Sequence, residues 1–185
     1  MKLIYKIIKE SILIILFAAI LSSIGGIGLQ AIEEKLVTLL PFLILFPALN
    51  GTAGNFGMII SSKFTTLLYE KKINKKWWKS KPLGNLISQV FGVAFISATY
   101  ISLLAIFAAK VQGFESINNL TLKIIAISLI SVLILVSFVL LISVSIGIYI
   151  YKNKKDPDNF LIPLTTSLAD LCSMLIFSGL IRVFF

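Results

Sequence analysis

The chain has 185 residues, of which 58% are hydrophobic and 14% are charged. Soluble domains are about half apolar and a quarter charged, so this composition indicates a polytopic membrane protein and excludes a water-soluble enzyme, a disordered chain and a coiled coil. The formal net charge is +9, but in a membrane protein the placement of basic residues matters more than their sum, and we expect no nucleic-acid partner. One cysteine and no histidine exclude an internal disulfide, a thiolate metal site and the usual imidazole ligand.

Five stretches are long and apolar enough to cross a bilayer, which takes about 20 residues. They comprise residues 11–29, 36–62, 83–109, 122–151 and 160–184. The sequence therefore predicts an all-α membrane protein with five transmembrane helices in one domain, 1–185. Residues 1–25 also fit a cleaved signal peptide, but their apolar run exceeds the roughly 7–15 residues usual for one, so we expect a retained helix.

Basic residues are distributed unevenly between the two ends of these spans. Thirteen of the 17 Lys and Arg residues precede the first span or fall in the connections 63–82 and 152–159, and four fall on the other side. Because positively charged loops stay in the cytosol, this predicts a cytosolic N-terminus and a C-terminus outside. Aromatic residues near the cytosolic ends are typical of an interfacial belt: Tyr5, Tyr69, Trp77, Trp78 and Tyr151.

The segment from Lys63 to Lys81 is rich in lysine. We expect it to contact anionic lipid headgroups, to which each Lys near the surface contributes about 1 kcal/mol of attraction. The alternative is a binding site for a specific regulator.

Small residues recur at intervals of four in three spans, at positions 18, 22 and 26, at 84, 88 and 92, and at 143 and 147. This spacing lets helices approach closely in lipid. It predicts helix–helix seams, and leaves open whether each seam lies within the chain or between subunits.

Asp170 is the only acidic residue deep within a predicted span. An ionised side chain costs about 2.5–3.5 kcal/mol at the centre of a membrane helix, so an acid at that depth is a functional candidate by default. Thr166 lies one turn away on the same face, and Pro163 frees a backbone carbonyl. We expect Asp170 and Thr166 to bind a cation; the alternative is an aspartate that only bonds a neighbouring hydroxyl.

The second predicted span contains a polar stretch at residues 47–55, which holds further candidates for the same site: Asn50, Gly51, Gly54 and Asn55. Proline, glycine and asparagine are poor helix formers, so we expect irregular backbone that lines a water-filled cavity. Counting from the helix ends places Asn50 at about the depth of Asp170. Carboxylate, amide, hydroxyl and carbonyl oxygens suit a hard cation such as Mg²⁺ or Ca²⁺.

One deep carboxylate per chain is too little charge to hold a dehydrated divalent cation. Two chains related by a twofold axis supply two carboxylates, and Mg²⁺ keeps several of its waters. The sequence therefore predicts a homodimer in the cell membrane, with a wide, hydrated cation path at its interface.

Two stretches resemble a known family. Residues 47–66 (PALNGTAGNFGMIISSKFTT) resemble the P-A-L-x-G-x-x-G-N-x-x-M…S-R-x-S-T signature of MgtE-type magnesium transporters and solute carrier family 41. Residues 156–170 (DPDNFLIPLTTSLAD) resemble their D-P-D-N…P…(T/S)…D element. The resemblance implies a five-helix unit, homodimeric in MgtE and duplicated in tandem in the eukaryotic carriers, that moves Mg²⁺ or a related divalent cation between two units. It also implies that Asp170 lines the central site, while Gly54 and Asn55 match a G-N pair.

The chain departs from this family pattern at several points. Thr52 and Phe56 stand where the MgtE branch has a further Asn and a Gln, and Lys63 replaces an arginine. We expect no cytosolic sensor domain of the kind that bacterial MgtE has, so the magnesium-sensing gate that such a domain provides cannot be assumed. The preferred divalent ion, and whether the unit is a channel or a coupled exchanger, stay open.

Two other classes of function explain less of the sequence. A membrane enzyme needs paired acids or an activated nucleophile. The close acid pair of Asp156 and Asp158 more simply caps the last helix or gathers cations at a cytosolic mouth. A non-transporting assembly subunit explains the small-residue seams, but it does not explain the deep Asp170.

Overall fold

The computed structural model describes residues 2–73, 79–114, 118–153 and 156–185. These residues form six helices joined by short turns: α1 (Lys2–Gln30), α2 (Glu33–Thr38), α3 (Leu40–Tyr69), α4 (Lys81–Val111), α5 (Asn118–Lys152) and α6 (Pro157–Phe184). The predicted all-α class is confirmed.

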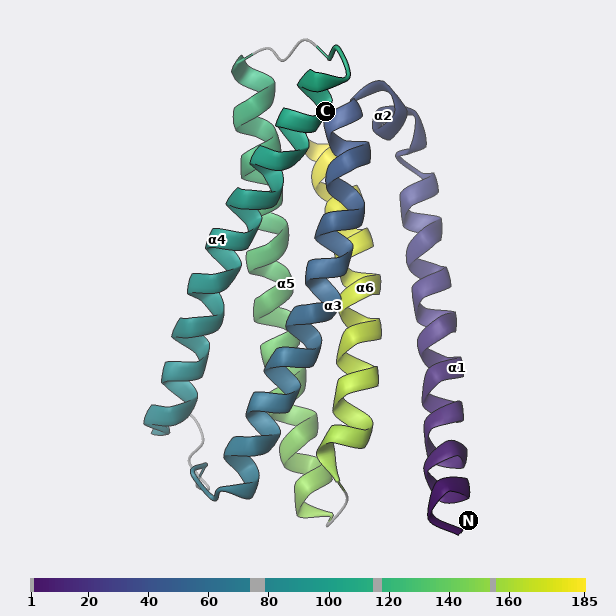
Figure 1. Ribbon diagram of the computed structural model, residues 1–185, viewed down its shortest axis with the longest axis vertical. Helices are drawn as coiled ribbons and strands as arrows, with labels where there is room; N and C mark the ends of the chain where they lie inside the picture. Colours follow the sequence, from purple (N-terminus) through teal and green to yellow (C-terminus); the bar gives the residue numbers. More distant parts are fainter. Residues whose placement is uncertain (1, 74–78, 115–117, 154–155) are drawn as a thin grey trace.

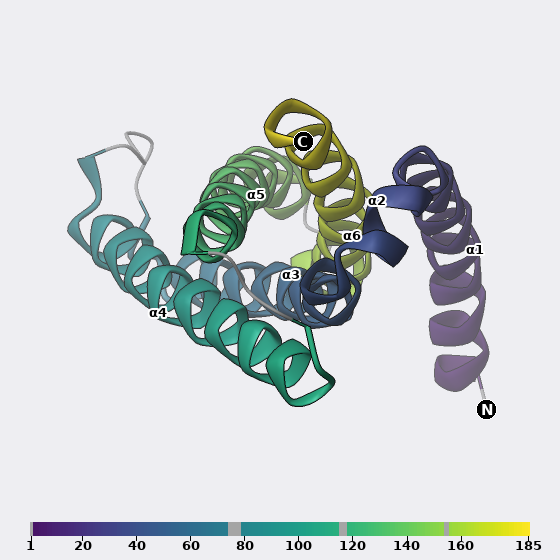
Figure 2. The ribbon, with the colours of Figure 1, turned by 90° about the horizontal axis from the view of Figure 1, so that it is seen from above.

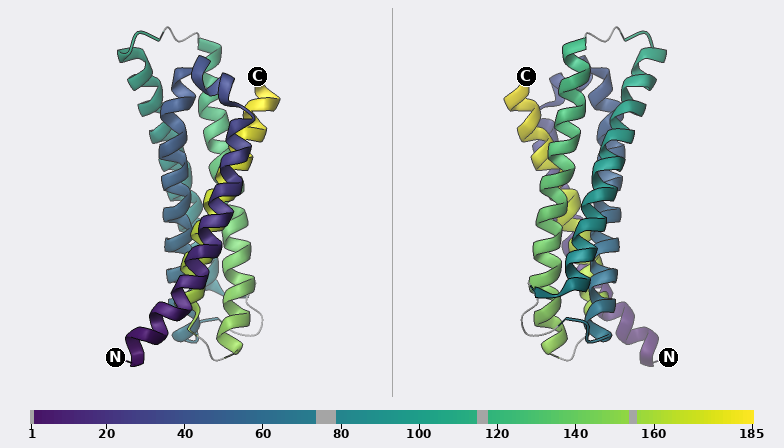
Figure 3. Two further views of the ribbon diagram at one scale, coloured as in Figure 1. Left: turned by 90° about the vertical axis from the view of Figure 1, so that its right-hand side faces the viewer. Right: turned by 90° about the vertical axis from the view of Figure 1, so that its left-hand side faces the viewer.

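The five long helices run lengthwise through the molecule, and the short α2 lies at the end that also holds the C-terminus (Figure 1). Seen from above, α3, α5 and α6 group at the centre, while α4 and α1 lie on opposite flanks (Figure 2). Helix α4 packs on α3 and α5, whereas α1 packs chiefly on α6. Helix α1 is inclined, so that the N-terminus diverges from the bundle (Figure 3). A site between α3, α5 and α6 would therefore be held in place by helices on several sides.

Within the described residues, four helices are long and apolar enough to cross a membrane. They are Leu40–Tyr69, Lys81–Val111, Leu120–Lys152 and Pro157–Phe184. The apolar stretch described in α1 is shorter, Ile15–Gln30. Four of the five predicted spans are thus confirmed as helices of spanning length and composition. The first is a helix, and that it spans the membrane stays a prediction.

The boundaries of the second predicted span are wrong at both ends. Its first residue, Leu36, belongs to α2, and α3 begins only at Leu40, with Pro41 in its first turn. Proline suits the start of a helix because its missing N–H would have no partner there. At the other end α3 continues past residue 62 to Tyr69, because polar side chains at an interface do not end a helix whose backbone is self-bonded.

The expectation of irregular backbone at residues 47–55 is also wrong. Helix α3 runs through this stretch without a break, with Pro47 in its interior. The Thr52 hydroxyl donates to the Ala48 carbonyl within the same helix. In an apolar environment a helix is the cheapest way to pair backbone N–H and C=O groups, and this outweighs the weak propensities of glycine and asparagine.

Only one of the three small-residue stripes faces another helix of the chain at its glycine. A Cβ added at Gly147 would lie 2.7 Å from the Phe64 ring and 2.9 Å from Leu161. Cβ atoms added at Gly26, Gly84 and Gly92 would meet nothing within 4 Å. The seams predicted at the first and third spans are therefore not seams within the described chain at those glycines.

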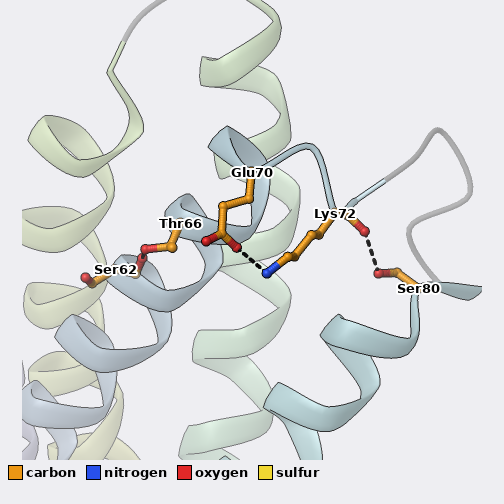
Figure 4. A network of polar contacts seen from close by, with 5 residues as sticks. All are labelled: Ser62, Thr66, Glu70, Lys72 and Ser80. Carbon is orange, nitrogen blue, oxygen red and sulfur yellow. Dashed lines mark hydrogen bonds and ion pairs between the residues drawn. The ribbon is translucent and has the colours of Figure 1, made fainter.

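The chain leaves α3 through a polar turn that Figure 4 shows in detail. Thr66 Oγ1 donates to the Ser62 carbonyl over 3.0 Å, and Ser80 Oγ donates to the Lys72 carbonyl over 3.1 Å. Glu70 and Lys72 form an exposed ion pair of 2.8 Å. Several predicted features of this basic region and of the aromatic belt lie outside the described residues: Lys75, Lys76, Trp77, Trp78, Lys154, Lys155 and the side chain of Tyr5.

Candidate functional site

The candidate site lies where α3 and α6 pack against each other in antiparallel orientation. At Gly57 the two backbones touch, because an added Cβ would lie 3.0 Å from the Thr165 carbonyl and from the Thr166 Cα. The absence of a side chain at Gly57 therefore sets how closely the two helices approach. This contact fixes the register of α3 against α6 on both sides.

A serine joins the two helices about two turns from this crossing. Ser173 Oγ donates to Asn50 Oδ1 over 2.5 Å, and it also lies 2.8 Å from the backbone carbonyl oxygen of Asp170. Ser173 is buried, and Asn50 and Asp170 are partly exposed. The structure thus places Asn50 beside the segment that carries the deep aspartate, as their matched depths predict.

Gly54 lies next to the Asp170 carboxylate. A Cβ added at Gly54 would lie in ordinary contact with Asp170 Oδ1, at 3.4 Å, and within the described part of the chain it would meet no other atom of a neighbouring helix within 4 Å. Gly54 and Asn50 are four residues apart and share one face of α3. Asn50, Gly54 and Asp170 are therefore brought together, as the sequence predicts.

Gly51 and Asn55 lie on a neighbouring face of α3, and both are exposed. A Cβ added at Gly51 would meet nothing within 4 Å. These two residues are neighbours in sequence of Asn50 and Gly54, but they are exposed and not packed against another helix of the described chain. Their predicted role as site residues stays a prediction.

Thr166 is oriented by its own helix. Its hydroxyl lies 2.8 Å from the Ile162 carbonyl and 3.0 Å from the Pro163 carbonyl, to which it donates. The hydroxyl proton is therefore used within the helix, and the hydroxyl oxygen keeps lone pairs that can accept hydrogen bonds from the waters of a hydrated cation.

Asp156 and Asp158 lie at the start of α6. Asp156 Oδ1 caps the helix by accepting from the Asp158 N–H over 3.2 Å, and Tyr69 donates to the same oxygen over 3.2 Å. Twelve residues separate Asp158 from Asp170, which corresponds to about 18 Å along a helix. The pair does not join the deep site. Its predicted role at a cytosolic mouth stays untested.

Two features of the site are not evident in the sequence. Ser173 is one, although its position three residues after Asp170 puts it on nearly the same helical face. The other is a cluster of fully buried hydroxyls on α3, α5 and α6. Ser61 Oγ lies 2.8 Å from Thr165 Oγ1 and 3.2 Å from Ser143 Oγ. Thr165 Oγ1 also lies 3.1 Å from the Gly57 carbonyl oxygen. Serine and threonine are too common in apolar helices to mark such a cluster in advance.

The described part of one chain holds no group of three or more His, Cys, Asp or Glu side chains able to bind a metal ion. A single carboxylate lined by amide, hydroxyl and carbonyl oxygens is the chemistry available at Asp170. Such a site favours a hard cation that keeps part of its water shell.

The family model of the MgtE divalent cation transporters matches residues 46–180. The chain belongs to this family. Solute carrier family 41 member 2 of Gallus gallus is 28% identical over 170 residues, and that of Xenopus laevis is 27% identical over 170 residues. Each match covers 85% of this chain and 29% of the relative, so the chain spans less than a third of their length. No solved structure matches the chain significantly.

The chain therefore belongs to a family of divalent cation transporters, and its several long apolar helices are those of a multi-pass membrane protein. The members of this family are transporters and not enzymes, so the family lends no support to the membrane-enzyme alternative. The matched segment contains both motifs and every predicted site residue, from Asn50 to Asp170.

Proposed function

We propose that the protein carries Mg²⁺, or a closely related divalent cation, across the plasma membrane along a hydrated path lined by Asp170. The observation that carries the proposal is the position of the Asp170 carboxylate next to Gly54. Asn50 lies one turn from Gly54 on α3 and is bonded to Ser173 of α6. This arrangement supports the proposal because the Asp170 carboxylate of α6 and the Asn50 amide of α3 lie about one turn apart on facing helices. The family of divalent cation transporters supplies the substrate class.

The missing side chain at Gly54 favours a hydrated ion over a naked one. Mg²⁺ loses water reluctantly and is bound through few carboxylates and several waters. A bulky side chain at Gly54 would occupy the space beside Oδ1, whereas glycine leaves it to a water shell. Asn50, Asn55 and Thr166 then act by hydrogen-bonding the ion's waters.

A second copy of the chain completes the path in this proposal. Two facing Asp170 carboxylates balance the charge of one divalent cation, and the exposed face of α3 that carries Gly51 and Asn55 is the surface through which the copies meet. An exposed amide on a membrane helix is costly unless it pairs or meets water. A twofold interface provides both for Asn55.

The remaining predictions fit this proposal. With the N-terminus in the cytosol, Asp156 and Asp158 lie at the inner mouth of the path. The segment from Lys63 to Lys81 then contacts anionic headgroups of the inner leaflet. An inside-negative potential drives entry, because a double charge gains about 4.6 kcal/mol per 100 mV.

The experiment that tests the function is uptake of Mg²⁺ by the purified protein in liposomes, read by a trapped magnesium dye, with and without an imposed potential. Asp170→Asn keeps the side-chain shape and removes the charge. We expect the wild type to transport and this variant to insert normally and lose flux. Wild-type flux in Asp170→Asn overturns the mechanism. No flux from the wild type favours the remaining alternative, an assembly subunit that does not transport.

A further inference from the structure

Two buried polar atoms near the start of α6 have no hydrogen-bond partner in the described part of the chain. They are Oγ1 of Thr65 on α3 and Oδ1 of Asp158 on α6. Thr65 is only 1% exposed. Buried polar atoms are nearly always satisfied, and leaving a charged one without a partner is costly. The pair therefore points to a ligand that binds between them.

The register of α3 against α6 places these two residues within about one helical turn of each other along the bundle. Ser61 bonds to Thr165, and Tyr69 donates to Asp156. Thr65 lies one turn from both Ser61 and Tyr69, so its neighbours on α6 lie between Asp156 and Thr165. Asp158 falls within that interval.

The helical faces agree with this placement. Thr65 lies four residues after Ser61, on the face of α3 that meets α6. Asp158 lies seven residues before Thr165, two turns along the face of α6 that meets α3. Asp158 also acts electrostatically on the Tyr69 hydroxyl, together with Asp156. The two residues thus lie on the facing sides of α3 and α6, about one turn apart along the bundle.

The carboxylate of Asp158 and the hydroxyl of Thr65 are groups that can bind a cation. An ionised carboxylate can only accept, and a threonine oxygen adds lone pairs. Asp156 contributes a second negative charge two residues away. Two negative charges and direct oxygen ligands suit a divalent cation that gives up part of its water shell.

We propose that Asp158 and Thr65 form a second divalent-cation site in each chain, distinct from the deep site at Asp170 and about 18 Å from it along α6. The identity of the ion rests on the proposed function. This site lies inside one chain, so it does not need the second copy, and it holds the cation at the end of the bundle where α6 begins.

Binding of Mn²⁺, a paramagnetic divalent cation, to the full-length protein in lipid nanodiscs tests the proposal. The Asp170→Asn background removes the charge of the deep site. We expect it to retain one divalent site per chain, which adding Asp158→Asn weakens roughly tenfold or more. The matched control is Glu70→Gln, an exposed acid at the same end paired with Lys72, which is expected to leave binding unchanged.

Thr65→Val keeps the proposal falsifiable if Asp158→Asn does not fold. Valine has nearly the shape of threonine and removes the unpartnered hydroxyl, so we expect a higher melting temperature than the parent without divalent cations. We also expect a smaller rise on addition of Mg²⁺, whereas Thr65→Ser keeps the parent's rise. A lower melting temperature with an unchanged Mg²⁺ effect indicates an ordered water only, and overturns the proposal.

Two further outcomes separate this proposal from the proposed function. If Asp170→Asn binds no divalent cation while the wild type transports Mg²⁺, the second site does not exist and the transport mechanism stands. If Asp170→Asn transports at the wild-type rate and Asp158→Asn loses binding, the second site stands and the role of Asp170 is wrong.

Discussion

Ser173 Oγ lies 2.5 Å from Asn50 Oδ1, which links α6 to α3 one turn from the deep aspartate. The same hydroxyl lies 2.8 Å from the Asp170 carbonyl oxygen. A hydroxyl carries one proton, so it can donate to Asn50 or to its own helix, but not fully to both. In the structure it donates to Asn50 Oδ1, so it orients the Asn50 amide and leaves that oxygen one further lone pair. In the proposed function this lone pair accepts a hydrogen bond from the water shell of the ion.

Ser173→Ala is expected to weaken the apparent affinity for Mg²⁺ roughly fivefold, because a lost hydrogen bond costs about 1 kcal/mol. The maximal rate is expected to change less, because the carboxylate remains. Liposome uptake as a function of Mg²⁺ concentration measures both. Ser137→Ala, which removes a hydroxyl bonded to Leu133 on an exposed face of α5, is the control. An equal effect in both variants contradicts the role of Ser173.

Asp170→Glu is expected to retain part of the flux with an altered order of preference among divalent cations. It keeps the charge, and its additional methylene narrows the space beside Gly54. Competition of Mn²⁺, Co²⁺ and Ca²⁺ with Mg²⁺ uptake measures the preference. An unchanged order of preference would show that the width at this level does not select the ion.

Gly54→Val and Asn55→Leu are each expected to abolish flux while leaving insertion intact. The first fills the space beside Asp170 Oδ1, where even a Cβ would lie at 3.4 Å. The second removes an amide from the exposed face of α3. Gly92→Val is the control, since a Cβ there meets nothing within 4 Å. Normal flux in both test variants moves the path away from this motif.

Gly57→Ala is expected to destabilise the fold by about 1–3 kcal/mol, because its Cβ meets the α6 backbone at 3.0 Å and backbone cannot move aside cheaply. Gly84→Ala adds a Cβ in open space and is expected to be neutral or slightly stabilising. Thermal unfolding in a mild detergent compares the two. Equal melting temperatures argue against a tight α3–α6 crossing.

Asn55→Cys in a Cys172→Ser background is expected to form a disulfide-linked dimer under oxidation. The two copies of residue 55 face each other in the proposed interface. Ile96→Cys, on the strongly exposed face of α4 (69% exposed), is the control and is expected to stay monomeric in the same membranes. Crosslinking at Ile96 but not at Asn55 would place the contact between copies on α4.

The sequence predicts the parts of the site at which a polar residue occurs within an apolar helix. Asp170, Asn50 and Gly54 are unusual residues for a membrane-spanning segment. Counting residues from the ends of two helices that run in opposite directions is enough to place them at about the same depth. Helix continuity at Pro47 is not predictable from propensity, because the apolar surroundings override it. The unpartnered oxygens of Thr65 and Asp158 are equally hidden, since their burial depends on how α3 and α6 pack.

The buried hydroxyls of Ser61, Ser143 and Thr165 have a consequence for how access to the ion can alternate between the two sides of the membrane. They tie α3, α5 and α6 together beside the backbone contact at Gly57. Sliding α6 along α3 would break these bonds and force the two backbones into collision, so the three helices move as one rigid body. In the proposed homodimer, opening and closing of the path would then be a rocking of whole chains against each other. Such a motion would leave the arrangement of Asn50, Gly54 and Asp170 unchanged, so the ion would meet the same groups from either side.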